Sequence, residues 1–295
     1  MSRLPLYLCN EVVRGLDFAA QCELAAALGY DGLELAPFTL GERPHELPDE
    51  RRREVRRAAE NAGLTIGALH WLLVTPPGLS ITTDDADIRA KTLAVMRGLI
   101  ELCADLGASV LVHGSPGQRR LPERADPANS EADSEADSAR DRAAETFAKA
   151  GEWAKAAGVT YCIEPLSRRE ANFVNTVAEA VAIVEHIGNP HLRTMIDCRA
   201  ARLSEESSVP ELIRKWVPRG MIHHVHLNDT NSRAPGQGDD TFGDVLSALS
   251  EVGYGGAAGV EPFEYVPDGP TAAARAIGYL RGAAERFMGR TGASA

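Results

Sequence analysis

The chain has 295 residues, of which 44% are hydrophobic and 25% are charged, as in an ordinary globular protein with a sizeable core. Asp and Glu number 42 against 31 Lys and Arg, and the resulting formal net charge of -11 argues against nucleic acid or an anionic membrane surface as a partner. No apolar run reaches the length of a membrane span, about 18 residues, and no pair of the five cysteines has CxxC spacing. We therefore expect a cytoplasmic protein with reduced thiols.

Short apolar runs alternate with helical segments along the whole chain. The first run is followed by a helix that Asp17 caps and Gly29 ends, and the same order then repeats. Predicted strands cover residues 4–9, 30–37, 64–71, 108–112, 158–166, 191–197, 220–229 and 256–263. Predicted helices cover residues 17–29, 48–62, 83–106, 139–157, 176–187, 209–216, 242–252 and 270–288.

Eight strand-then-helix units in one chain predict an α/β fold, a single (β/α)8 TIM barrel over residues 1–295. The alternative is a doubly wound open sheet. That fold normally carries a glycine fingerprint after its first strand, and the stretch Leu8-Cys9-Asn10-Glu11 has none. The pattern therefore favours the barrel.

Residues 116–138 differ from the rest of the chain in composition. This segment contains the acidic repeat Ser-Glu-Ala-Asp at residues 130–133 and 134–137 and has no apolar periodicity. We interpret it as an acidic, flexible insertion between the fourth strand and its helix. A solvated loop is favoured over a lid.

Acidic and imidazole side chains stand near the carboxyl ends of seven predicted strands. They are Glu34, His70, His113, Glu164, Asp197, His226 and Glu261. In TIM barrels these strand ends carry the active site, and Asp, Glu and His are the ligand types of Mn²⁺, Mg²⁺, Co²⁺ and Zn²⁺. Buried charge without a partner is costly, so a bound cation is a simple explanation of the set. A structural carboxylate network is the alternative.

Glu164, Asp197, His226 and Glu261 come from four successive strands and can converge from one side of the barrel mouth. Carboxylates on the fifth and eighth strands can face a ligand from opposite sides. This arrangement suits proton transfer next to a carbonyl, in which a metal stabilises an enediolate while carboxylates remove and return the proton.

The motifs around these residues resemble the xylose isomerase-like barrel superfamily. They are Glu164 in IEPL, Asp197 at a strand end, HVHLND followed by Pro-Gly-Gln-Gly, and Glu261 in GVEPF. The resemblance spans nearly the whole chain. Within the superfamily, the chain resembles the D-tagatose 3-epimerase-like enzymes. It implies a divalent metal, most often Mn²⁺, held by Glu164, Asp197, His226 and Glu261. It also implies that Glu164 and Glu261 act as acid and base.

The sequence departs from the epimerase pattern at two positions. Ala200 stands where those enzymes usually have a substrate-binding histidine, three residues after the aspartate ligand. Their substrate-binding arginine would fall on Ser232, and Arg233 lies one residue further along. A one-residue loop shift would give Arg233 this role. Glu170, six residues after Glu164, matches a substrate contact of the family or is a solvated loop charge.

Three further residues are candidates for contact with a substrate. His70 can hydrogen-bond a sugar hydroxyl while Trp71 packs against the sugar ring, although Trp71 also fits a core position. His113 is a substrate contact or, as in DNA-repair relatives, a ligand of an additional zinc ion.

These features predict a metal-dependent isomerase or epimerase of a keto-sugar, cyclitol or related polyol. A dehydratase or C-glycoside lyase could use the same site and stays open as the alternative. An endonuclease IV-like nuclease is disfavoured by the negative charge, and a non-catalytic barrel is the remaining possibility. The expected partner is a small polyol or keto-sugar, and a homo-oligomer stays open.

Overall fold

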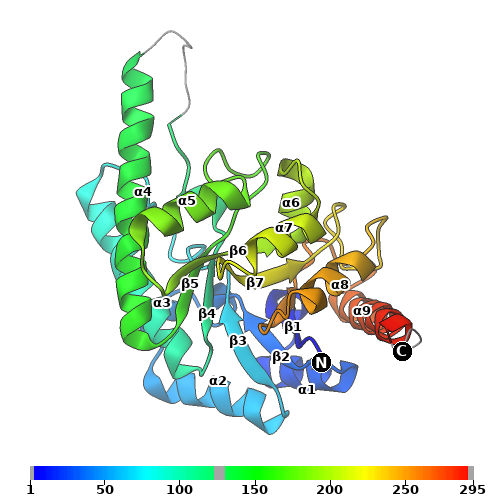
Figure 1. Cartoon of the computed structure of the whole chain (residues 1–295). Coiled ribbons are helices and arrows are strands. Elements are labelled where there is room, and N and C mark those ends of the chain that lie inside the picture. The colour runs from blue at the N-terminus through cyan, green and yellow to red at the C-terminus, as the bar shows by residue number, and fades with distance from the viewer. Residues whose placement is uncertain (1–2, 123–129, 292–295) are drawn as a thin grey trace.

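The computed structural model describes residues 3–122 and 130–291 and shows eight parallel strands that form a closed barrel (Figure 1). The strands are β1 Leu6–Cys9, β2 Gly32–Leu35, β3 Thr65–Leu69, β4 Val110–His113, β5 Thr160–Ile163, β6 Leu192–Asp197, β7 Ile222–Leu227 and β8 Ala258–Val260. Each strand pairs with the next in the chain, and β1 pairs with β8 through Leu6 opposite Ala258 and Leu8 opposite Val260. The predicted (β/α)8 barrel is confirmed.

Helices surround the barrel. They are α1 Phe18–Leu28, α2 Asp49–Asn61, α3 Ala86–Asp105, α4 Ser130–Ala157, α5 Val177–Ile187, α6 Cys198–Ser204, α7 Val209–Trp216, α8 Gly243–Glu251 and α9 Gly269–Thr291. The predicted caps are present, because Asp17 accepts a hydrogen bond from the Ala20 amide at 2.9 Å and Gly29 ends α1 with a φ of 89°. Within the described residues no helix is long and apolar enough to span a bilayer.

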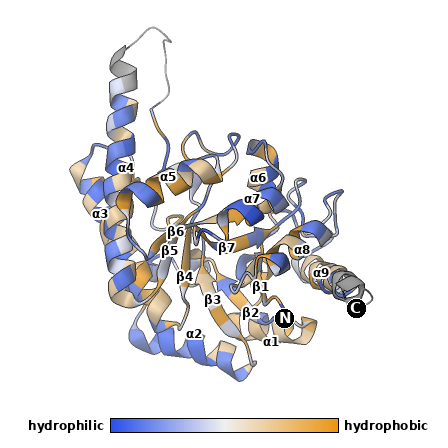
Figure 2. Ribbon diagram, in the orientation of Figure 1, coloured by the Kyte–Doolittle hydropathy of each residue, from blue (hydrophilic) through white to orange (hydrophobic). Residues whose placement is uncertain are grey.

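Apolar side chains fill two separate regions. The main core lies between the strands and the inner faces of the helices, and Figure 2 shows hydrophobic strands beside the largely hydrophilic α2. A smaller cluster on β3 to β6 consists of Ala68, Val110, Val112, Cys162 and Met195. Since side chains alternate along a strand, this cluster points into the barrel. The Tyr7 ring lies beside Gly32 and Gly67, where a Cβ atom would come within 2.7 and 1.9 Å of it.

The segment after β4 is more helical than its composition suggests. Helix α4 begins at Ser130, so the acidic repeat forms its first turns, whereas we expected a loop from 116 to 138. Alanine and glutamate are good helix formers, and acidic residues are favourable near a helix N-terminus. Figure 1 shows α4 projecting beyond the other helices. Residues 123–129 of the expected loop lie outside the described residues.

Candidate active site

Four side chains converge at the carboxyl ends of β5 to β8. They are Glu164, Asp197, His226 and Glu261, all of them buried, with one ligand atom from each lying within 4.8 Å of all the others. The Nδ1 atom of His226 lies 2.9 Å from Glu261, 3.7 Å from Glu164 and 3.9 Å from Asp197. The four residues expected to act as ligands therefore form one cluster.

The chemistry of this cluster fits a divalent cation. His226 Nδ1 and Glu261 Oε2 are buried, and neither makes a hydrogen bond to any of the described residues despite their short separation. The opposite nitrogen of the ring, Nε2, lies 2.8 Å from an oxygen of Glu34. A carboxylate on one ring nitrogen and a free position on the other is the usual arrangement of a metal-binding histidine.

Electrostatics point to the same conclusion. Burial, together with the charges of Glu164 and Glu261, raises the pKa of Asp197 from 3.8 to about 7. Burial alone would lower the pKa of His226, but the charges of Glu261 and Glu34 raise it well above its usual value. Three buried carboxylates are costly without positive charge nearby, which a bound cation would supply.

Small residues and backbone contacts make room for the cluster and hold it. A Cβ atom on Gly114, directly after β4, would lie 1.6 Å from Oε2 of Glu164. Asp197 caps α6, because its Oδ1 accepts a hydrogen bond from the Ala200 amide at 2.6 Å, and its Oδ2 accepts one from the Asn228 amide group at 2.6 Å. Fully buried Arg119 donates a hydrogen bond to the backbone carbonyl of Glu164 at 2.6 Å.

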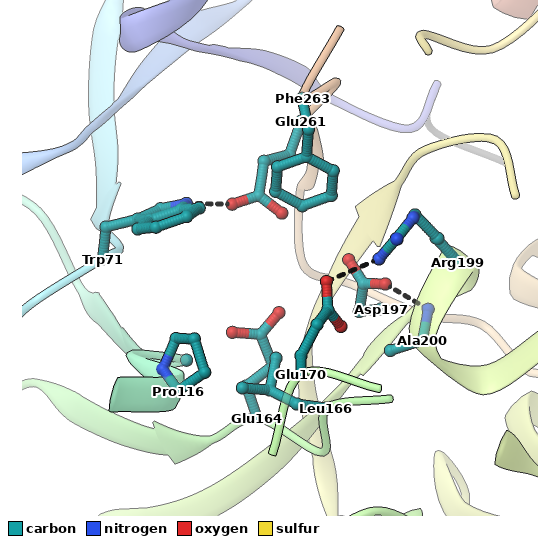
Figure 3. Close-up of a pocket in the computed structure, with 11 residues that line it drawn as sticks. Trp71, Pro116, Glu164, Leu166, Glu170, Asp197, Arg199, Ala200, Glu261 and Phe263 are labelled. Atoms are coloured by element: carbon teal, nitrogen blue, oxygen red, sulfur yellow. Dashed lines mark hydrogen bonds and ion pairs between the residues drawn. The ribbon is translucent and has the colours of Figure 1, made fainter. Parts of the chain in front are cut away.

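A pocket with an empty volume of about 460 Å³, part of it open to solvent, lies over the cluster (Figure 3). Glu164 and Glu261 stand on opposite sides of it, and Trp71, Leu166 and Phe263 add apolar wall. The Trp71 indole donates a hydrogen bond to Oε1 of Glu261 at 2.8 Å, and Trp71 has a left-handed φ of 53°. Trp71 therefore lines the pocket and holds a carboxylate of the cluster.

Glu170 also lines the pocket, next to Arg199, which had not been predicted from the sequence. Its carboxylate accepts a hydrogen bond from Arg199 at 2.7 Å. Arg199 further donates to the Ser232 hydroxyl at 3.1 Å and packs over the Phe263 ring. The signal that could have identified Arg199 is its position two residues after the Asp197 ligand.

Three residues predicted to contact a substrate do not line the pocket, although Nε2 of His70 lies 3.9 Å from Oε1 of Glu261. His70 is fully buried and pairs with Glu11 at 2.9 Å, because its side chain points into the barrel interior. His113 is also fully buried, bonded to the Tyr161 hydroxyl at 2.6 Å, and burial lowers its pKa to about 3. The side chain of Arg233 is 40% exposed and lies 3.7 Å from Glu264 outside the pocket lining, because its loop carries it toward solvent.

A closed parallel barrel with acidic and imidazole side chains gathered at its strand ends defines the class of protein. The family model of the xylose isomerase-like TIM barrel matches residues 22–283, which is most of the chain. The chain belongs to this family, and the resemblance inferred from the motifs is confirmed.

The relatives are sugar epimerases. D-psicose 3-epimerase of Agrobacterium fabrum is 28% identical over 246 residues, which are 83% of this chain and 79% of that protein. L-ribulose 3-epimerase of Mesorhizobium japonicum is 29% identical over 187 residues, 62% of this chain and 58% of that protein. A solved structure of L-ribulose 3-epimerase superimposes with a TM-score of 0.79 at 22% identity, covering 100% of this chain and 99% of that one, which shows the shared fold.

Proposed function

We propose that this protein is a divalent-metal-dependent ketose 3-epimerase. The observation that carries the proposal is the pair of carboxylates, Glu164 and Glu261, on opposite sides of one pocket above a cluster suited to a cation. The names of the relatives supply the reaction class, since they are ketose 3-epimerases, whereas none of those cited above is a dehydratase or lyase.

The cluster of Glu164, Asp197, His226 and Glu261 would hold the cation, with Mn²⁺ as the favoured ion. When bound, the cation would place positive charge beside the carbonyl and neighbouring hydroxyl oxygens of the sugar, which stabilises an enediolate.

The two glutamates move the proton. One carboxylate takes the proton from carbon 3 of the ketose, so that a C–H bond breaks and an O–H bond forms on the carboxyl group. The other, protonated, returns a proton to the opposite face of the same carbon, and the reverse reaction exchanges the roles. Carboxylates on two sides of the substrate thus favour inversion at one carbon.

The pocket wall suits an uncharged sugar. Among the described residues that line it there is one cation, Arg199, and it is already paired with Glu170. Four lining carboxylates, Glu164, Glu170, Asp197 and Glu261, would repel a phosphate group. We therefore propose an unphosphorylated ketose as the substrate.

The test is proton exchange in heavy water. Metal-loaded protein incubated in D₂O with D-psicose, D-fructose and L-ribulose should place deuterium at carbon 3 of both epimers. Glu261→Gln and Glu164→Gln should each slow this exchange at least about 100-fold, the usual contribution of a general acid or base. Glu264→Gln, an exposed glutamate near Glu261, is the matched control and should exchange at the wild-type rate.

Metal content is measured on every variant, because Glu164 and Glu261 are also proposed ligands. Wild-type protein that binds the metal yet incorporates deuterium into none of the ketoses would rule out the epimerase proposal. Exchange at the wild-type rate in metal-loaded Glu261→Gln would remove Glu261 from the reaction.

A further inference from the structure

Glu34, in the middle of the barrel, contacts three imidazole rings. It is fully buried, and its Oε2 lies 2.8 Å from Nε2 of His224 while its Oε1 lies 2.8 Å from Nε2 of His226. The Nδ1 atom of His70 lies 3.7 Å from Oε1. A Cβ atom on Gly259 would lie 2.5 Å from Oε2, so β8, on the other side of β1 from β2, leaves space for this carboxylate.

The contact to His226 decides where that ring carries its proton. An ionised carboxylate accepts hydrogen bonds and cannot donate them, so Nε2 of His226 must be the protonated nitrogen. In the neutral ring, which is the form that binds a metal, the Nδ1 atom then keeps its lone pair, and this is the atom that faces Glu164, Asp197 and Glu261. A histidine binds a metal through the unprotonated nitrogen only.

We infer that Glu34 is a positioning residue that selects the metal-binding tautomer of His226. The inference rests on the metal site of the proposed function, and it adds a residue that touches neither the pocket nor the proposed ion. His224 has a supporting part, because it occupies the second oxygen of Glu34 and so keeps the carboxylate from rotating away from His226.

A glutamine at this position distinguishes the tautomer role from simple packing. Its side chain has nearly the same shape, but it presents one oxygen and one NH₂ group to His224 and His226. The histidine that faces the NH₂ group, His224 or His226, must accept a hydrogen bond at Nε2 and therefore carries its proton on Nδ1. Even when the oxygen faces His226, the hydrogen bond loses its charge and weakens by about half.

The experiment compares metal affinity and ring protonation in four proteins. Mn²⁺ affinity is measured by titration calorimetry of the EDTA-stripped protein, and the histidine tautomers by ¹⁵N NMR of the Zn²⁺-loaded protein. We expect Glu34→Gln to bind Mn²⁺ about 10–100-fold more weakly than wild type, the range for loss of such a supporting carboxylate. A new Nδ1–H signal from His224 or His226 should accompany that loss, whereas wild type should show Nε2–H on both rings.

Two variants control for charge and for folding. Glu11→Gln removes a negative charge from the same barrel interior, but Glu11 bonds to His70 and does not contact His226. Its Mn²⁺ affinity should stay within about threefold of wild type, with unchanged signals from His224 and His226. Glu34→Asp keeps the carboxylate and should retain the Nε2–H tautomers, with an affinity between those of wild type and Glu34→Gln.

The outcomes separate this inference from the proposal on which it rests. If wild type and Glu34→Gln bind Mn²⁺ equally and both show Nε2–H on His226, Glu34 does not select the tautomer and the metal site stands. If Glu11→Gln loses as much affinity as Glu34→Gln, the effect is one of charge and the inference is overturned. If wild-type protein takes up neither Mn²⁺ nor Zn²⁺, the metal site itself is wrong and the inference fails with it.

Discussion

The guanidinium group of Arg199 is held on three sides at the pocket wall. Glu170 accepts one hydrogen bond, the Ser232 hydroxyl accepts another, and the Phe263 ring packs against it. A planar cation held in this way loses little side-chain freedom when it binds a ligand. Arg199 is therefore suited to contact a polar ligand in the pocket beside Ala200, one of the positions at which the sequence departs from the epimerase pattern.

Arg199→Met should raise the KM for the ketose about tenfold or more with a smaller change in kcat, because hydrogen bonds from a charged donor contribute about 1.5–3 kcal/mol. Steady-state kinetics on the metal-loaded protein measure both constants. Arg233→Met, which alters a side chain outside the pocket lining, is the matched control and should leave both constants within about twofold of wild type. A rise in KM in the Arg233 variant alone would show that Arg233, and not Arg199, contacts the substrate.

Among single residues, the sequence predicted the four that stand at strand ends and also named Trp71 and Glu170 of the pocket lining, but it missed Arg199. Glu164, Asp197, His226 and Glu261 could be named because parallel strands deliver their last side chains to one place. Arg199 could not, since it stands in α6, which begins directly after β6 and had not been predicted. Trp71 reaches Glu261 through a left-handed backbone conformation that no local pattern of side chains indicates.

Strand ends and the turns that follow them are the elements that shape the site. Gly114, after β4, occupies the space beside the Glu164 carboxylate, which follows the neighbouring β5. The strand pattern predicted all eight strands, because apolar runs of the right length recur between helix caps. It did not predict α6 or the full length of α4, since a short helix after a strand has little periodicity and the acidic repeat has no apolar face.

Gly114→Ala should fold but lose at least about tenfold in metal affinity and in kcat/KM, because its methyl group and the Glu164 carboxylate cannot occupy the same volume. Gly117→Ala is the matched control, since a methyl group there meets nothing within 4 Å among the described residues and should have no effect. Calorimetry and circular dichroism check binding and folding. Wild-type metal affinity in Gly114→Ala would show that Glu164 is free to move and is not packed in its ligand position.

At the scale of the whole molecule, the closed barrel buries a group of ionisable side chains in its interior. The pKa of Asp197 rises from 3.8 to about 7 because of burial and the neighbouring glutamates. Between these pH values the folded, metal-free protein therefore binds more protons than the unfolded chain, so its free energy of unfolding falls as the pH rises. At about 1.4 kcal/mol per pKa unit, this contribution is on the order of 4 kcal/mol. The raised pKa of His226 extends the same trend to higher pH.

Mn²⁺ should therefore raise the melting temperature more at pH 8 than at pH 6, because Asp197, whose pKa is raised to about 7, is mostly ionised only at the higher pH, where the cation offsets its negative charge. Thermal unfolding of the EDTA-treated protein, with and without Mn²⁺, gives this difference. In Asp197→Asn the metal-free protein should lose part of its pH dependence between about pH 4 and 7. An equal or smaller gain at pH 8 would contradict the electrostatic account of the cluster.

The pairing of β1 with β8 has a consequence for biosynthesis. The proposed ligands follow the order of translation, from Glu164 to Glu261, and the Glu34 carboxylate that contacts His226 comes from β2, near the beginning of the chain. The four side chains come together only when β8 pairs with β1, so metal uptake would report closure of the barrel wall during synthesis.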